Sequence, residues 1–312
     1  MKNYPTKPPT IQKVRLDSKD KARMITEMGS SRFSASVVPF LQKCNTRIRF
    51  EYPNVATLHV ITATNHIPPY ALMIRALKRV VCIMRDFGLQ KHLQFYLVPS
   101  PLTRCFPSPR EMVQEQHING GYTYATKDTV FIFRFEEFPK VMLHETIHHL
   151  PLDPGSAWPA HRIKEMYKQF RIDPSGCPHR CATDLMPNEA ITELWADIYH
   201  CQFLSYEYGY PLRAMLRHER DWAMGQAKRV LQHQRDFFPM WKEATHAYSY
   251  IVIRAVLFDH LYDFVKLDVP YSMDRLSQFI LTWSKSKRFQ RAISESKIPS
   301  TDSFRMTVYG NL

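Results

Sequence analysis

Two histidines and a glutamate in this sequence have the residue types and the spacing needed to hold a metal ion and to use it. His144, Glu145 and His148 form the pattern His-Glu-x-x-His within an apolar stretch. On a helix, residues four apart lie on the same face, so the two imidazoles can bind one ion. Glu145 lies beside them and can take a proton from a water on the metal and pass it to a leaving amine. The alternative is a helix that carries histidines on its surface.

A third metal ligand must come from elsewhere, because a hydrolytic zinc uses three protein ligands and one open position. Glu189, Glu193 and Asp197 recur at four-residue spacing and therefore share one face of a predicted helix. That helix is otherwise apolar, and buried carboxylates without a cationic partner would be costly. A metal ion would supply the positive charge, whereas a solvated acidic stripe is the alternative.

Together the two patterns resemble the gluzincin clan of zinc metallopeptidases. In that clan a glutamate on a second helix is the third ligand, and an acid four residues later orients a ligand histidine. The resemblance implies one Zn²⁺ held by His144, His148 and Glu189, with Glu193 as the orienting acid; the preceding asparagine favours this assignment. The other match makes Glu193 the ligand and Asp197 the orienting acid. The separation between the two motifs is longer than in the best-known members of the clan.

A later apolar segment carries His246 and Tyr250, which share a face if the segment is helical. In gluzincins a histidine or tyrosine from a late helix hydrogen-bonds the oxyanion of the reaction, so the resemblance implies this role for either residue. A core histidine and a packed tyrosine are the alternatives. His149 points about 100 degrees away from His148 on a helix, so we expect it in the cleft or on the surface and not as a ligand.

The stretch 119–123 (Asn-Gly-Gly-Tyr-Thr) and residues 133–141 further resemble uncharacterised gluzincin-like proteins of large double-stranded DNA viruses. The likeness covers roughly residues 115–265. It implies the virion or the cytoplasm of an infected cell as the location, and it implies no substrate.

Composition and charge limit the partners. The chain has 312 residues, 45% of them apolar, which is enough for one large domain or two joined subdomains. Lysine and arginine exceed the acidic residues by 42 to 29, and the resulting charge of +13 attracts nucleic acid, acidic protein segments or anionic membranes. No nucleic-acid-binding motif accompanies the charge, so only non-specific contact is indicated. We expect a peptide or protein substrate, possibly an acidic one, and the oligomeric state is not predicted.

No apolar run reaches the roughly 18 residues that cross a bilayer, and residues 1–15 lack the apolar region of a secretory signal. We therefore expect a cytoplasmic protein that is not secreted and has no membrane partner. The six cysteines lie scattered along the chain, which favours reduced thiols. Cys177, His179 and Cys181 could bind a second metal or form a local disulfide, and an ordinary loop is the alternative.

The apolar patterns predict the elements that position these residues. Strands are expected at 57–61, 93–98, 122–125 and 129–133, and helices at 70–87, 139–150, 162–170, 188–204, 212–232, 241–265 and 272–284. A strand, helix, strand unit and a hairpin would lead into the motif helix. We expect strand 129–133 to be an edge strand that accepts the substrate as an added strand.

These elements predict an α+β fold, with a small N-terminal sheet, a mainly helical C-terminal half and a zincin-like cleft between them. The expected parts are a basic polar arm at 1–35, an α/β subdomain at 36–150, a cleft-shaping loop at 151–187, a helical subdomain at 188–285 and a polar tail at 286–312. The sequence thus favours a zinc-dependent peptidase. The other hypotheses are a non-catalytic virion structural protein that keeps a zinc site, and a basic protein associated with nucleic acid.

Overall fold

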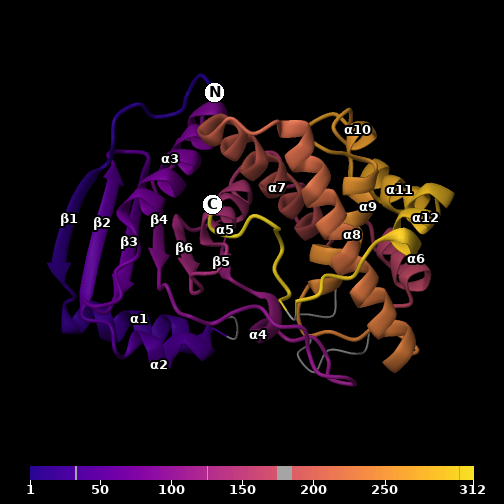
Figure 1. Ribbon diagram of the computed structural model, residues 1–312, viewed down its shortest axis with the longest axis horizontal. Coiled ribbons are helices and arrows are strands. Elements are labelled where there is room, and N and C mark those ends of the chain that lie inside the picture. The colour runs from indigo at the N-terminus through magenta and orange to yellow at the C-terminus, as the bar shows by residue number, and fades with distance from the viewer. Residues whose placement is uncertain (32–33, 125, 174–184, 302) are drawn as a thin grey trace.

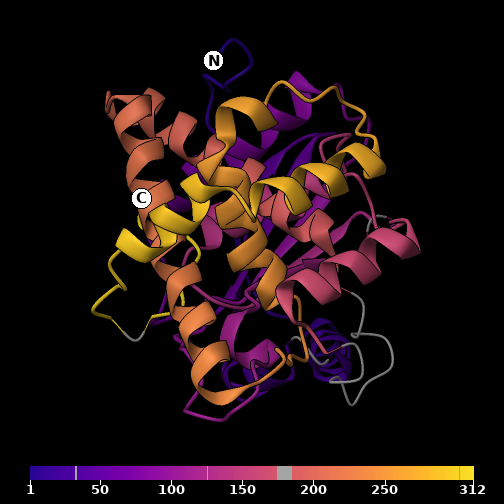
Figure 2. The same cartoon turned by 90° about the vertical axis from the view of Figure 1, so that its right-hand side faces the viewer.

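A computed structural model describes residues 1–31, 34–124, 126–173, 185–301 and 303–312. It has the predicted α+β fold, in which a mixed sheet occupies the N-terminal half and helices form most of the C-terminal half (Figure 1). The sheet lies on the left of Figure 1, and the helical half faces the viewer in Figure 2.

The sheet has six strands in the order β1-β2-β3-β4-β6-β5. These strands are β1 (Thr10–Arg15), β2 (Thr46–Tyr52), β3 (Ala56–Thr62), β4 (Leu93–Leu97), β5 (Gly121–Thr123) and β6 (Thr129–Ile132). Strands β3, β4 and β6 are parallel, and the other pairs are antiparallel. Helix α3 (Tyr70–Asp86) connects β3 to β4, so the predicted strand, helix, strand unit is confirmed.

Helices cover both faces of the sheet. Helices α3 and α5 (Phe138–Ile147) pack on one face, where their apolar side chains meet those of β4 and β6, such as Phe95 and Ile132. Helix α1 (Ser18–Ser30) packs on the other face through Met24 and Met28. Because every residue of β3 and of α5 is buried, the sheet holds the motif helix firmly along its length.

The remaining helices are mostly in the C-terminal half. They are η1 (Ala35–Val37), α2 (Val38–Leu41), α4 (Glu115–Ile118), α6 (Ala160–Phe170), α7 (Pro187–Tyr208), α8 (Leu212–Phe237), η2 (Ser249–Ile253), α9 (Arg254–Asp259), α10 (Leu261–Phe264), α11 (Met273–Trp283) and α12 (Lys287–Glu295). Helices α6 to α9 and α11 share one large apolar core. Helix α7 also lies against α5, so it joins this core to the sheet (Figure 1).

Two predictions about these elements are wrong. Strand β6 pairs with both β4 and β5, so residues 129–133 are not at the edge of the sheet, and the short strand β5 is. The reason is that β6 is buried beyond its first residue and packs parallel to β4, which leaves the outer position to its hairpin partner. The helix predicted over 241–265 begins only near residue 247, because the Glu243 carboxylate accepts the amide of Tyr248 and holds the preceding residues in a loop.

The chain ends also differ from the expected arm and tail. Residues 1–35 contain β1, which pairs with β2, and α1. Strand β1 is exposed except at the half-buried Val14, so it has no apolar alternation that a sequence pattern could reveal. Beyond residue 286 the chain forms α12, and then Phe304 and Met306 are buried.

The loop predicted at 151–187 contains α6, which coincides with its expected helical piece. The cysteine and histidine cluster Cys177, His179 and Cys181 lies outside the described residues. In the part of the chain that the structure describes, Cys44, Cys82, Cys105 and Cys201 are free thiols. Among the described residues no helix is long and apolar enough to cross a membrane.

A buried ion pair fixes the start of α5 to the C-terminal segment. Glu137 precedes the helix in the left-handed region at φ 58° and is fully buried. Its carboxylate accepts hydrogen bonds from the Arg104 guanidinium and from the backbone amides of Met306 and Thr307, the last at 2.6 Å. Each oxygen therefore has a donor, and the segment after residue 303 cannot leave without exposing a buried charge.

We predict that Glu137→Ala lowers the free energy of unfolding by about 3–5 kcal/mol, because it leaves the buried Arg104 uncompensated. Urea denaturation followed by circular dichroism measures this. The control is Glu295→Ala, which removes the exposed partner of Arg291 and should leave the midpoint nearly unchanged. Equal midpoints for the two variants would contradict the prediction.

Candidate metal centre

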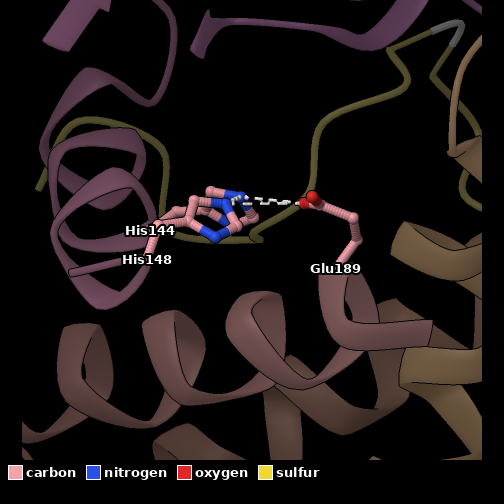
Figure 3. Close-up of side chains that lie close together, drawn as sticks. All are labelled: His144, His148 and Glu189. Atoms are coloured by element: carbon pink, nitrogen blue, oxygen red, sulfur yellow. Dashed lines mark hydrogen bonds and ion pairs between the residues drawn. The ribbon is translucent and has the colours of Figure 1, made fainter. Parts of the chain in front are cut away.

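The two motif histidines and one glutamate meet between α5 and α7. His144 lies in the last turn of α5 and His148 follows as its C-cap, so both rings project from the end of that helix. Glu189 lies in the first turn of α7, which Pro187 opens. Figure 3 shows the two rings and the carboxylate pointing toward one another from these two helices. A carboxylate is favourable there, because the helix N-terminus carries a partial positive charge.

Their distances are those of a ligand set. The Nε2 atoms of His144 and His148 are 3.2 Å apart, and Oε2 of Glu189 is 3.4 Å and 3.6 Å from them. This Oε2 is buried and accepts no hydrogen bond from any described residue. A buried carboxylate oxygen without a donor is costly, and a cation would satisfy it. His144, His148 and Glu189 thus form a group that could hold a metal ion.

Two further carboxylates orient the rings. Nδ1 of His144 is 2.7 Å from Oε2 of Glu193, and Nδ1 of His148 is 2.7 Å from Oδ2 of Asp153. When Nδ1 donates to a carboxylate, Nε2 is the unprotonated nitrogen that can bind a metal. Each ring therefore presents Nε2 toward Glu189.

Asp153 is a site residue that the sequence analysis missed. It lies in the turn just after α5, where its other carboxylate oxygen accepts the amide of Gly155 at 2.8 Å. Its only signal in the sequence is an acid five residues after the second motif histidine, and such an acid commonly caps a turn. The fold gives it a second role because the chain reverses at the end of α5.

The three acids of α7 have different neighbours. Glu189 reaches Nε2 of both histidines, whereas Glu193 reaches the opposite side of His144. Asp197 lies one turn further, within 3.2 Å of Lys140 and 3.0 Å of Arg254. The expectation that a metal neutralises this acidic face therefore fits Glu189 alone, and protein cations neutralise the rest.

The electrostatic environment favours a positive charge between the ligands. Burial alone would lower the pKa of His144, but Glu189 and Glu193 raise it to about 10. The pKa of His148 is also raised against the effect of burial, by Glu189 and Asp153. With these raised pKa values the imidazoles would be protonated and would carry positive charge between the carboxylates. A metal ion would compete with those protons for the ring nitrogens.

Glu145 lies beside the ligands without belonging to their group. It is buried, and burial raises the pKa of its carboxyl group above the ordinary value. A cavity of about 30 Å³ adjoins it, lined also by His144, Tyr250, Gly120 and Gly121. A cavity of this size accommodates a water molecule. The approach of β5 is close, since a Cβ atom on Gly121 would lie 3.2 Å from Oε1 of Glu145.

Tyr250 and His246 approach from the helical half. The Tyr250 ring centroid is 5.9 Å from that of His144. Burial and the carboxylates of Glu189 and Glu145 raise the pKa of Tyr250 well above its usual value, so its hydroxyl is a proton donor at neutral pH. His246 lies in the loop before the helix, and its carbonyl accepts the Tyr250 amide at 3.0 Å. Both residues lie near Glu189, but only Tyr250 lines the cavity.

His149 is placed apart from the ligand group, as expected. Its Nε2 is 3.2 Å from Oγ1 of Thr123 on β5, and burial lowers its pKa to about 4. It therefore connects the end of the motif helix to the edge strand as a neutral side chain.

We predict that Glu189→Gln weakens metal binding more than Glu193→Gln, because loss of a ligand exceeds loss of an orienting group. Competition with a chromophoric chelator measures both affinities, and His144→Ala combined with His148→Ala provides the baseline without binding. The reverse order would identify Glu193 as the ligand and Asp197 as its orienting acid.

Comparison of the chain with known protein families, with curated proteins and with solved structures found no match.

Proposed function

We propose that the protein is a zinc-dependent peptidase whose ligands are His144, His148 and Glu189 and whose general base is Glu145. The observation that carries the proposal is the position of Glu145, beside the ligand group and next to a cavity that can hold water. A purely structural metal site needs only its ligands, and among the described residues Glu145 lies outside that group.

Zinc fits the ligand set better than harder cations. Two imidazoles and one carboxylate form a typical catalytic zinc donor set with a fourth position open, whereas magnesium and calcium prefer oxygen ligands alone. Tetrahedral bonds of about 2.0–2.1 Å place neighbouring ligand atoms roughly 3.3–3.4 Å apart. The three distances of 3.2, 3.4 and 3.6 Å agree with this spacing.

The residues of the chain divide the chemistry among them. A bound zinc ion would polarise the scissile carbonyl and lower the pKa of a water molecule. Glu145 takes a proton from the attacking water and returns it to the leaving amine, a role suited to a carboxyl group whose pKa burial has raised. The neutral hydroxyl of Tyr250 donates a hydrogen bond to the oxygen on which negative charge develops.

The edge strand β5 supports a peptide as the substrate. Gly120 and Gly121 line the cavity beside Glu145, and the outer edge of β5 has backbone groups that no neighbouring strand pairs with in the described sheet. An extended peptide that adds to this edge would run past Glu145. Substrate binding is thus proposed at β5 and not at β6.

We predict that Glu145→Gln retains about one zinc ion per chain and the thermal stability of the wild type, and loses cleavage of a diverse peptide library by roughly a hundred- to ten-thousand-fold. The change alters charge and proton capacity but hardly any volume. Elemental analysis, thermal unfolding and mass spectrometry of the library measure the three properties. Glu165→Gln, the same change at an exposed position of helix α6, should behave as the wild type.

The outcomes separate the hypotheses. If the wild type folds and is supplied with zinc but elemental analysis finds none bound, the zinc site is excluded. Equal cleavage by wild type and Glu145→Gln would exclude the mechanism. A wild type that holds zinc but cleaves nothing in the library would favour a structural role for the metal.

A further inference from the structure

We infer that Lys140 and Arg254 are positioning residues of the metal centre, which hold the Glu193 carboxylate in the orientation that fixes His144. The inference rests on the proposed zinc site. It adds to that site the two cationic side chains that contact Glu193, the acid that orients His144. In the described chain neither side chain forms an ion pair or hydrogen bond with His144, His148 or Glu189, so each would act through Glu193.

The contacts of Glu193 divide between its two oxygens. Oε2 is 2.7 Å from Nδ1 of His144. Oε1 accepts the Lys140 ammonium and lies 3.4 Å from Nη1 of Arg254. A carboxylate with a hydrogen bond to His144 alone could rotate about its last torsion angle. Cations that contact the other oxygen fix the orientation of the carboxylate plane.

Asp197 balances the charge of this cluster. It lies one turn after Glu193 on α7 and contacts both cations, at 3.2 Å from Lys140 and 3.0 Å from Arg254. Two cations thus face two carboxylates, and all four side chains are at most 5% exposed. Buried ion clusters cost desolvation energy and seldom add net stability to the fold. The orientation that this cluster gives to Glu193 therefore explains its presence better than stability does.

The cluster of Lys140, Glu193, Asp197 and Arg254 connects three helices and the C-terminal segment, and it lies on the Nδ1 side of the His144 ring. Lys140 is on α5, one turn before His144, and Arg254 begins α9. Nη1 of Arg254 also donates to the carbonyl of Met306 at 2.6 Å. A shift of any of these elements would therefore reach the His144 ring through Glu193.

A purely structural ion cluster is the alternative, and the chain provides a matched control for it. Arg79 on α3 is fully buried and forms an ion pair with Glu207 at 2.5 Å. This pair has no contact with His144, His148 or Glu189 in the described chain. Arg79→Met should therefore destabilise the fold as the cluster variants do, but leave the zinc site intact.

The test measures the zinc dissociation constant of Lys140→Met, Arg254→Met and Arg79→Met by competition with a chromophoric chelator, together with thermal unfolding. We expect both cluster variants to bind zinc about tenfold more weakly or worse, which is the size of effect that supporting groups of a metal site have. Arg79→Met should stay within about twofold of the wild type. Lower melting temperatures with unchanged zinc affinity in the cluster variants would overturn the inference.

A double-mutant comparison tests whether Lys140 acts through Glu193. In a Glu193→Gln background, Lys140→Met should weaken zinc binding by much less than it does in the wild type, because the group that it orients is already altered. Fully additive effects would overturn the inference. The absorption spectrum of the cobalt-substituted protein gives a second readout, since it reports the ligand geometry directly and should change in Lys140→Met but not in Arg79→Met.

If Lys140→Met does not fold, Lys140→Met combined with Asp197→Leu removes one charge of each sign and keeps the cluster neutral. This variant should fold and bind zinc more weakly, and wild-type affinity in it would overturn the inference. A wild type that binds no zinc would overturn both proposals. A wild type that binds zinc but cleaves no peptide would favour a structural role for the metal and leave the positioning role in place.

Discussion

The contact between α5 and α7 is the constraint on which the site depends. Helix α5 is buried along its whole length and α7 over most of its length, yet polar side chains of the two helices face each other. Buried polar groups in such a contact are costly unless they have partners. An orienting acid lies behind each imidazole and two cations lie behind one of those acids, whereas Oε2 of Glu189, between the two rings, accepts no hydrogen bond from a described residue. Moving either helix along the other would break several of these pairs at once.

Apolar packing on both sides supplies the rigidity that this contact needs. The sheet core fixes α5 from one side, through side chains such as Phe138 and Leu143. The helical core fixes α7 from the other side, through Ile191 and Leu194. Because interiors are close-packed, the distance between the two helices is set by these layers and not by the polar groups. The polar groups can therefore be arranged for a cation without having to hold the protein together.

Much of this arrangement could be predicted from the sequence, because it depends on local spacing. The motif places His144 and His148 on one face, and the acidic repeat places Glu189 and Glu193 on another, whatever the rest of the chain does. The parallel unit of β3, α3 and β4 is equally visible, since each strand has an apolar face and the segment between them has helical apolar spacing. Strand β1 could not be recognised, because one exposed edge strand needs only backbone pairing.

Contacts that depend on the path of the folded chain could not be predicted from the sequence. Nothing around Asp153 marks it as the partner of His148, since that role arises from how the chain turns after α5. The position of β6 inside the sheet likewise depends on pairing across the molecule. The same is true of Lys140 and Arg254, which are single charges in apolar helices and would be interpreted as interruptions of an apolar pattern.

The burial of Phe304, Met306 and Thr307 has a consequence for how the protein is made. Their backbone groups bond Glu137 at the start of the motif helix and Arg254 behind the orienting acid. During synthesis the motif helix and α7 leave the ribosome long before these residues do. Until then Glu137 and Arg254 lack part of their buried partners, so the nascent chain has an incomplete centre. Under the proposed function, metal binding should therefore follow translation of this segment, and a ribosome stalled before it would present a chain that binds the ion poorly.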